Sequence, residues 1–469
     1  MSRFTHTRKK LSLAFVLAFA SPSMAFAHST QSLSDKWECI SCIEQAKVRS
    51  HAGTFADPKP FDEETVRGAI HRGPGGFYRA EFNGVRAPHD ALPEGKKSTT
   101  QWTFLAERAG TFESPRFKGD PTYPGAIHYD DGKYYRSRVT RQAAGIIDQN
   151  TFELVTTVRH FIVTSDPQYP WSDKTNKPGD TESTSERKRR SKQLITEQYH
   201  AINRFRQERG GTIPVMVNGD ITAFGHGDEL TTMKRLLDIL SRFPGPVFVG
   251  LGNHDYENNV NDCANNGCAR DMLQWLDNYV TTQLKPPGYD LSKEYATLYE
   301  AWTGSLSYWH VSGGTGFIQF NNYPGYTKNF SSGRLLIDTK RDFRIKSDMA
   351  WFKKAIADTK YNSDFTIINM HDIGNAASSE YFKVIADRKG DGFGIAAIFA
   401  GHYHDAMGVW RNRAELRDMP VFISGAAAER TFLIAEHHDT QRLLRVYGVT
   451  GNDTSQRKLL AEIPTDELN

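Results

Sequence analysis

Five short apolar segments, each ending in polar residues, constrain the fold of this chain more than any other feature. They are HFIVTSD (160–166), IPVMVNGD (213–220), PVFVGLGNHD (246–255), DFTIINMHD (364–372) and GIAAIFAGHYHD (394–405). Each is too short for a helix, and amphipathic patterns over 194–205 and 230–240 predict helices between them. Wholly apolar strands alternating with helices predict an α/β fold whose sheet is covered on both faces.

The polar residues at the ends of these strands form a set of candidate ligands. In an α/β sheet, ligands gather beyond the carboxyl ends of the strands. The residues expected there are Asp166, Gln168, Asp220, Asn253, His254, Asp255, His371, His402 and His404. Carboxylate and amide oxygens with imidazole nitrogens suit divalent Zn, Mn or Fe. One Asp can bridge two metals, and the two histidines of His402-Tyr-His404 can each reach a different metal of the pair.

Taken singly, these residues have ordinary structural interpretations. Asp220 alone is more typical of a helix cap or a turn. His371 alone is more typical of a hydrogen-bonded structural histidine. It is the ordered set that predicts a metal site.

The ordered set resembles the calcineurin-like metallophosphoesterase superfamily, whose pattern is D-x-H, GD, GNH[DE], H and GH-x-H. Four of the five blocks are present as written, and the match covers roughly residues 158–430. The resemblance implies a metallophosphoesterase-type β-sandwich flanked by helices. It also implies that Asp220 bridges two metals. Asp166 and His404 would bind the first metal, and Asn253, His371 and His402 the second. His254 would contact the phosphate or protonate the leaving oxygen, with Asp255 orienting it.

Gln168 is the departure from the family pattern, which most often has His at this position. A Gln carbonyl can still bind a hard metal or hold a metal-bound water, which allows a weaker or different first metal site. The resemblance is therefore to a D-x-Q variant of the first motif. The purple acid phosphatase branch also lacks that His, but it has a Tyr three residues after the bridging Asp. Here that residue is Ala223, which argues against a Tyr-bound ferric site.

The resulting functional hypothesis is a phosphoesterase that cleaves phosphate mono- or diesters with a hydroxide activated by two divalent metals. Tyr169, Trp171 and His226 are candidate substrate-pocket residues, although core or loop packing explains Tyr169 and Trp171 equally well. A non-catalytic binding protein on the same fold, with Gln168 as the mark of a decayed site, is the alternative. Superfamily membership leaves the substrate open.

The basic run RKRRSK (187–192) permits either a solvated helix start, which we favour, or a phosphate- or membrane-binding surface. It is also the sole feature in favour of nucleic-acid binding, which we do not expect. No segment after the leader described next is predicted to span a membrane.

The amino terminus predicts export. Residues 1–27 combine a basic start, an apolar core and small residues spaced A-x-A, as in a secretory signal peptide. Removing them takes away four basic residues and changes the formal charge from +3 to −1. The rest divides into a β-rich or irregular region (28–157), the metallophosphoesterase domain (158–435) and a C-terminal strand or tail (436–469).

The four cysteines occur as two local pairs, Cys39 with Cys42 and Cys263 with Cys268. An even number of cysteines in an exported chain favours disulfides, here within each pair. A four-cysteine zinc site is the alternative.

Overall fold

The computed structural model describes the chain over residues 152–465, apart from 334–338, 375–378, 391–393, 412–415 and 417–418, and over short pieces between 38 and 137. The predicted leader, 1–27, lies outside the described residues, and so does Cys42. Within the described part, Cys263 and Cys268 form the predicted disulfide. None of the described helices combines the length and apolar character needed to cross a membrane.

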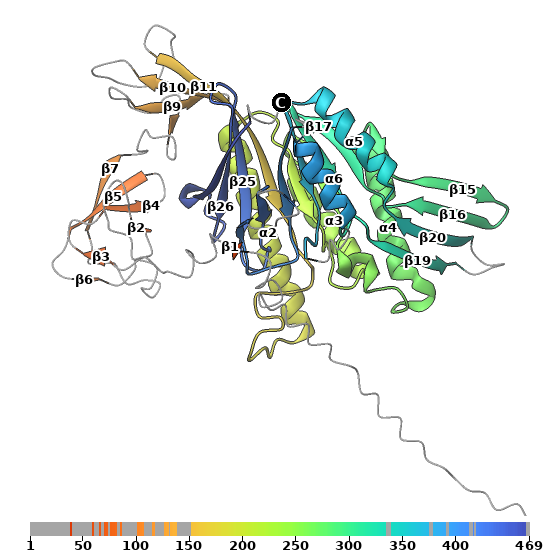
Figure 1. Ribbon diagram of the computed structural model, residues 1–469. Helices are drawn as coiled ribbons and strands as arrows, with labels where there is room; N and C mark the ends of the chain where they lie inside the picture. The colour runs from red at the N-terminus through yellow and green to blue at the C-terminus, as the bar shows by residue number, and fades with distance from the viewer. Residues whose placement is uncertain are drawn as a thin grey trace, which may run out of the picture.

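Two sheets form the body of the molecule (Figure 1). The first has the order β1 (Glu38–Cys39), β23 (Gly408–Arg411), β24 (Val421–Ile423), β22 (Ile395–Ala400), β21 (Phe365–Asn369), β18 (Thr315–Gln319), β17 (Tyr308–Ser312) and β14 (Gly288–Tyr289). Strands β18, β21, β22 and β24 run parallel to one another. Their carboxyl ends therefore lie at one edge of the sheet.

The second sheet contains the other predicted strands. Its order is β27 (Lys458–Pro464), β26 (Leu443–Val449), β25 (Phe432–His438), β11 (Phe152–Thr164), β10 (Lys133–Ser137), β9 (Ile127–Asp130) and β8 (Arg116–Phe117). Strand β11 also pairs in parallel with β12 (Val215–Asn218), which pairs in parallel with β13 (Val247–Gly250). Strand β11 crosses the predicted boundary at 157/158, and β26 and β27 are formed by the predicted C-terminal tail.

The two sheets face each other across the core, as predicted for a β-sandwich. Phe161 of β11 meets the rings of Phe317 and Phe399 at 5.5 and 5.7 Å between centroids, and Phe248 stacks on Phe317 at 5.3 Å. Aromatic pairs of this kind add to the hydrophobic stabilisation that burial provides. The apolar strands are buried on both sides because one face meets the opposite sheet and the other meets helices.

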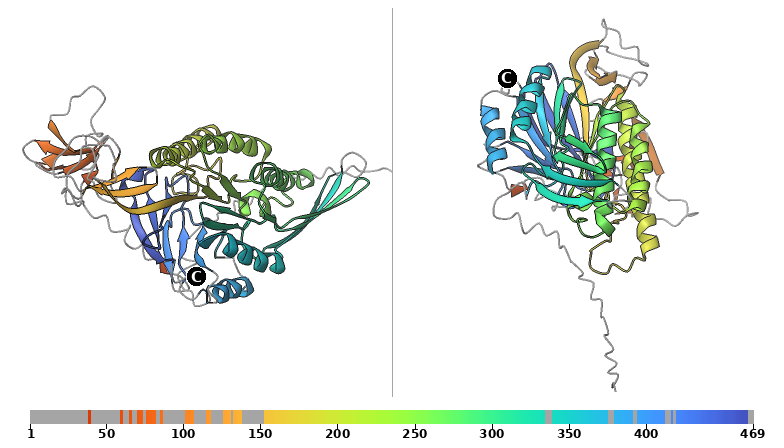
Figure 2. Two further views of the ribbon diagram at one scale, coloured as in Figure 1. Left: turned by 90° about the horizontal axis from the view of Figure 1, so that it is seen from above. Right: turned by 90° about the vertical axis from the view of Figure 1, so that its right-hand side faces the viewer.

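Helices cover the outer faces of both sheets (Figure 2). Helices α2 (Thr184–Arg209), α3 (Gly227–Ser241) and α4 (Gly267–Tyr279) pack their apolar side chains against the second sheet. Helices α5 (Met349–Asn362) and α6 (Ser379–Gly390) pack against the first. The predicted helices 194–205 and 230–240 lie inside α2 and α3, so both predictions are confirmed. Ser183 starts α2 with a capping box to Glu186.

Smaller sheets surround this body. Strands β15 (Ser292–Ala296), β16 (Tyr299–Gly304), β20 (Lys340–Lys346) and β19 (Thr327–Ser332) form an arm that projects from it (Figure 1). In the N-terminal region, β2 (Lys59–Pro60), β4 (Ile70–Gly73), β5 (Gly76–Glu81) and β7 (Gln101–Ala106) form one sheet, and β3 (Thr65–Val66) pairs with β6 (Val85–Arg86). The described pieces of 28–157 are thus strands, in keeping with the β-rich prediction.

A buried ion pair in β25 gives a prediction about stability. Glu436 is 1% exposed and accepts from Arg457 Nη2 at 3.1 Å. Burial alone would raise the pKa of Glu436, but Arg457 and the neighbouring His160 hold it well below its usual range. Glu436→Gln leaves Arg457 without its anionic partner, so we expect the free energy of unfolding to fall by about 3–5 kcal/mol at pH 7.

Urea titration measures this change. The control is Glu462→Gln, which removes a pair with Arg445 in the same sheet whose Glu side chain is 44% exposed. We expect it to cost under about 1 kcal/mol. Folding depresses the pKa of Glu436. The extra stability of wild type over Glu436→Gln should therefore be present at neutral pH and should shrink as the pH falls below the pKa of Glu in the unfolded chain. Equal losses for the two variants would contradict the prediction.

Candidate metal centre

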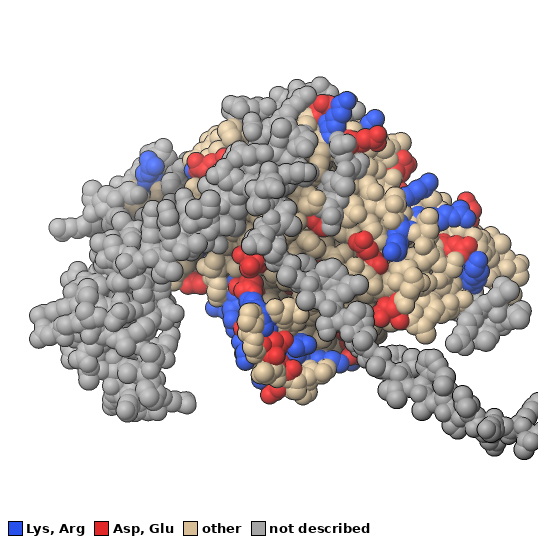
Figure 3. Space-filling model, turned by 60° about the horizontal axis from the view of Figure 1, so that its bottom comes forward, with Lys and Arg blue, Asp and Glu red and all other residues tan. Residues whose placement is uncertain are grey.

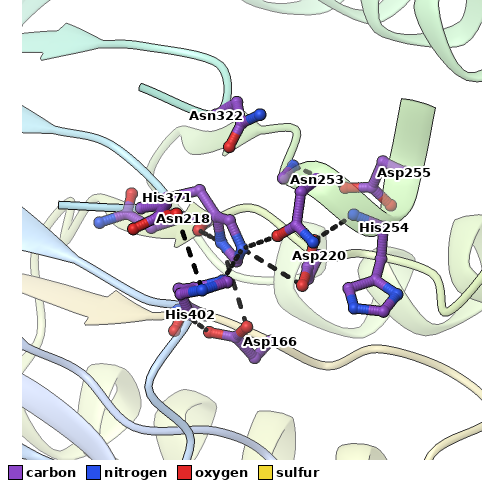
Figure 4. A network of polar contacts seen from close by, with 12 residues as sticks. Asp166, Asn218, Asp220, Asn253, His254, Asp255, Asn322, His371 and His402 are labelled. Carbon is purple, nitrogen blue, oxygen red and sulfur yellow. Dashed lines mark hydrogen bonds and ion pairs between the residues drawn. The ribbon is translucent and has the colours of Figure 1, made fainter. Parts of the chain in front are cut away.

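The carboxyl ends of strands from both sheets converge on one group of side chains (Figure 4). Asp166 follows β11, Asp220 follows β12, Asn253 follows β13, His371 follows β21, and His402 and His404 follow β22. Backbone hydrogen bonds tie the loops together. The amide of Asp166 donates to the Gly219 carbonyl at 3.1 Å, and the amide of Gly401 donates to the His371 carbonyl at 3.0 Å. The side chains are therefore held by a network of loops rather than by one element.

Four of the candidate ligands have a left-handed backbone conformation. The φ angles are 50° at Asp166, 41° at Gln168, 47° at Asp220 and 70° at His402. Such angles are uncommon outside glycine and persist where the surrounding structure imposes them. Here the adjoining loops impose them, because the Gln168 amide donates to the Asp220 carbonyl at 2.8 Å and the His402 amide donates to Asp166 Oδ2 at 2.9 Å. Strained backbone of this kind is typical of functional sites.

The side chains form two groups that share Asp220. In one, ligand atoms of Asp166, Asp220 and His404 all lie within 4.8 Å of one another; in the other, those of Asp220, His371 and His402 do. Asp220 Oδ2 lies 3.2 Å from His371 Nε2, and Asp166 Oδ1 lies 3.2 Å from His404 Nε2. A carboxylate shared by two clusters of N and O atoms is the arrangement that bridges a pair of metal ions.

His371 and His402 present defined nitrogens to the second group. His371 Nδ1 donates to the Asn218 carbonyl at 2.9 Å, which leaves Nε2 to face Asn253 Oδ1 at 3.0 Å. His402 Nδ1 lies 3.3 Å from the same Nε2. A second hydrogen bond that fixes the tautomer is usual for histidines that bind metals.

The electrostatics of the cluster favour a cation. Burial alone would lower the pKa of His371, but the carboxylates of Asp220 and Asp166 outweigh it and raise the pKa to about 10. Burial would likewise raise the pKa of Asp220, yet His371 and His254 hold it below its usual range. Two ionised carboxylates in a buried site need positive charge nearby. A divalent metal ion would provide it, and the donors present fit Mn, Zn or Fe.

Gln168 adds an unused oxygen to the first group. Its side chain is 1% exposed, and neither amide atom has a hydrogen-bond partner. It lines the same cavity as Asp166 and His404. Since buried polar atoms are almost always paired, an unpaired buried amide beside two ligands fits a role in binding a metal or its ligand water.

His254 and Asp255 occupy different parts of the site. His254 Nδ1 donates to the Ala223 carbonyl at 2.9 Å, so the Ala223 carbonyl orients the ring. The Asp255 carboxylate accepts from the amides of Ile221, Thr222 and Gly252 at 2.8–3.0 Å. Burial and the nearby Asp220 raise the pKa of Asp255 to about 7. Asp255 therefore supports the loop that leads to Ala223, whose carbonyl orients the His254 ring.

Gly252 is required by the close approach of two loops, and this gives a test of the centre. A Cβ on Gly252 would overlap Asp220 Oδ1 and would lie 2.6 Å from its backbone nitrogen, although φ of Gly252 is −107°. Gly252→Ala should therefore displace Asp220 and lower metal affinity, by about 10–100-fold if it acts like the loss of a supporting contact.

Equilibrium dialysis against Mn²⁺ or Zn²⁺ measures this affinity. Gly227→Ala is the matched control, because a Cβ there meets nothing within 4 Å at the start of α3. Unchanged metal affinity in Gly252→Ala would show that Asp220 does not have to stay where the structure places it.

A cavity of about 270 Å³ opens beside the first group. Its lining includes Asp166, Gln168, Trp171, Lys177, His404 and Glu429. Of the three predicted pocket residues, Trp171 lines this cavity. Tyr169 is 6% exposed and packs in the hydrophobic core, which is the alternative that the sequence left open. His226 is absent from the lining, and its ring pairs with Asp262 at 3.4 Å and Glu229 at 3.5 Å.

The basic run at the start of α2 supports the wall of this cavity. Arg190 pairs with Asp173, Arg187 with Asp180 at 2.7 Å, and Lys188 with Asp228 at 2.6 Å. Figure 3 shows positive and negative side chains intermixed on this face. The pairing supports the helix-start interpretation, because Arg187 and Arg190 hold the preceding loop and Lys188 pairs with α3 instead of forming a separate basic surface.

Sequence reasoning missed three supporting residues. Asn218 and Ala223 act through backbone carbonyls, which no side-chain motif reveals. Asp372 Oδ2 lies 3.6 Å from His402 Nε2, on the side of the ring opposite the second group. Its position directly after His371, in the segment NMHD, was the available signal.

Of the comparisons with known proteins, the family model agrees with the geometry. The model of the calcineurin-like phosphoesterase family matches residues 159–406. None of the curated proteins matches. Among solved structures, the chain is similar to purple acid phosphatase PPD1 from yellow lupin (Lupinus luteus) seeds, with 9% identity, a TM-score of 0.36, and coverage of 82% of this chain and 58% of that one.

A second similar structure is the sulfate thiohydrolase SoxB of Thermus thermophilus, with 12% identity, a TM-score of 0.35, and coverage of 64% of this chain and 58% of that one. The chain thus spans less than two thirds of either protein, and likenesses at this level say nothing of what it binds or cleaves. The family model, by contrast, covers more than half of the chain and all of the residues gathered at the strand ends. The chain belongs to the calcineurin-like phosphoesterase family.

Proposed function

We propose that the protein is an exported, metal-dependent phosphoesterase that hydrolyses phosphate mono- or diesters with two divalent metal ions. The observation that carries the proposal is the pair of ligand groups that share Asp220. Ordinary structural ion pairs do not explain why two histidine-containing clusters share one buried carboxylate. A site for two metal ions would explain it.

The residues divide into those that hold metals and one that handles a proton. Asp166, His404 and Gln168 would hold the first metal, Asn253, His371 and His402 the second, and Asp220 both. Bound there, the metals supply a nucleophilic hydroxide and neutralise charge on the phosphoryl oxygens. His254 carries a proton on Nδ1, held by Ala223, and moves a second proton from Nε2 to the leaving oxygen.

The alternative, a binding protein with a decayed site, predicts the loss of several ligands. Two observations support metal binding over a decayed site: the two groups that share Asp220, and Gln168, which is buried with its amide unpaired. An amide oxygen in place of a nitrogen changes the preference of the first site toward harder ions but keeps a donor there.

The experiment is metal analysis of the purified protein, paired with hydrolysis of aryl phosphate mono- and diesters in added Mn, Zn, Fe or Mg. We expect about two metals per chain and turnover that depends on them. The ratio of monoester to diester turnover then narrows the substrate class. One metal or none, with no turnover under any metal, would refute the proposal in favour of a binding role.

Export is part of the proposal and rests on separate support. The signal-like segment 1–27 and the disulfide between Cys263 and Cys268 both fit an oxidising compartment. Cell fractionation of a strain that expresses the full chain tests it. Full-length protein retained in the cytoplasm, with 1–27 uncleaved, would contradict it.

A further inference from the structure

Two aromatic side chains lie beside His254, the residue assigned to the leaving group. The ring of Trp171 is 5.1 Å from that of His254 and 5.8 Å from that of His404, edge to face in both cases. The ring of Phe224 lies 6.5 Å from that of His254. A leaving group whose oxygen is at His254 therefore extends into aromatic surroundings.

Phe224 is unusual in being both large and apolar at an exposed position beside the centre. Phe224 is 43% exposed. Its ring stacks on the ring of His226, with 5.6 Å between centroids and an interplanar angle of 24°. The other exposed large hydrophobic residues in the described part of the chain are Tyr295, Leu298, Tyr361 and Leu459. They belong to the arm, to α5 and to β27, all away from the ligand groups. We call Phe224 and His226 the aromatic shelf.

Contacts with Glu229 and Asp262 hold the two residues of the aromatic shelf in place. The Phe224 amide donates to Glu229 Oε2 at 2.9 Å, and Glu229 is 4% exposed on α3. The His226 ring lies between Glu229 and Asp262. The intervening Gly225 has φ of +65°, and a Cβ there would lie 2.7 Å from Asn259 Nδ2. Because the backbone at Phe224 and the ring of His226 are held in place, covering the shelf orders little of the protein.

We propose that the aromatic shelf stacks a planar ring in the leaving group of the substrate, as the base of a nucleotide would provide. This inference rests on the proposed phosphoesterase activity and names its substrate class. A stacked pair that includes an exposed ring is a platform for a third ring, since such stacking tolerates any aromatic partner.

The distance between Phe224 and His254 favours a leaving-group ring that is joined to the ester oxygen through a spacer. In the proposed reaction the leaving oxygen would lie at His254 Nε2, whereas the centre of the Phe224 ring is 6.5 Å from the centre of the His254 ring. A ring bonded directly to the ester oxygen would therefore stop at His254 and Trp171. A ring carried on a spacer of several atoms reaches Phe224, and the ribose of a nucleoside 5′-phosphate is such a spacer.

The test uses two substrates that differ only in the ring. AMP and ribose 5-phosphate share the leaving oxygen and the sugar, so the ratio of their kcat/KM values reports the contribution of the base. We expect wild type to prefer AMP and Phe224→Ala to lower the ratio about tenfold, the effect of losing one base–aromatic stack. Phe224→Trp should keep the ratio. If only diesters are cleaved, the methyl esters of the same two compounds replace them.

The controls separate this inference from the proposed function. Tyr361→Ala removes an aromatic ring that is 85% exposed on α5, and should leave the ratio unchanged. A ratio near one in wild type, or an equal loss on both substrates in Phe224→Ala, would overturn the shelf while the phosphoesterase stands. No turnover of AMP, ribose 5-phosphate, their methyl esters or 4-nitrophenyl phosphate in the metal-loaded enzyme would refute both.

Discussion

Asp220→Asn is expected to abolish hydrolysis and to lower the metal content of the protein. Asp220 is 1% exposed, one of its oxygens accepts from the His254 amide at 2.9 Å, and the other lies 3.2 Å from His371 Nε2. The Asn side chain has nearly the same shape but carries no charge and offers one acceptor oxygen instead of two. Because both ligand groups depend on Asp220, both metal sites should weaken together.

The expected loss of activity in Asp220→Asn follows from what the metals contribute to catalysis. Metal ions supply several kcal/mol of transition-state stabilisation, so their loss should lower kcat/KM by about 10³-fold or more. Metal analysis after dialysis and kinetics at saturating metal measure the two effects. Asp238→Asn, at an exposed position on α3, is the control and should change neither. Full activity with two bound metals in Asp220→Asn would contradict the shared-ligand assignment.

His254→Ala is expected to separate metal binding from proton transfer. His254 belongs to neither ligand group, and its Nδ1 is held by the Ala223 carbonyl. Its loss should leave the metal content unchanged while kcat falls by about 10²–10⁴-fold, the usual contribution of a general acid–base residue. The loss should be smaller for substrates with a good leaving group, such as 4-nitrophenyl phosphate, because they need less protonation.

The control for this variant is His200→Ala, at an exposed position on α2. It should keep full activity on every substrate. If His254→Ala lost its metals, His254 would be a ligand or a support of one. If its activity fell equally for good and poor leaving groups, a role in phosphate contact would replace that of a proton donor.

The apolar strands and their polar ends could be predicted from the sequence because both are local. A wholly apolar segment such as 215–217 has to be buried on both faces, whatever surrounds it. A polar residue that follows it directly, such as Asp220, then lies at the sheet edge. Parallel strands place their carboxyl ends together, so the order of the motifs predicted the ligand set that the structure brings to one place.

What the sequence could not predict comes from contacts between distant segments. Strands β9 and β10 extend the same sheet as β11, so the chain has no structural break at the predicted boundary of 157/158. The aromatic segment that forms β10 did not indicate in its sequence that it would pair with β11. Tyr169 and Trp171 both follow β11 within a few residues, yet Tyr169 packs in the core and Trp171 lines the cavity.

The amino-acid sequence by itself determined which strands form, which residues stand at their ends, and therefore which donors are available to bind metals. The tertiary structure alone decided what each donor faces. His371 is fixed by a carbonyl 153 residues away and His254 by one 31 residues away. Burial is encoded by local composition, whereas the direction of a hydrogen bond depends on which loops the folded sheets bring together.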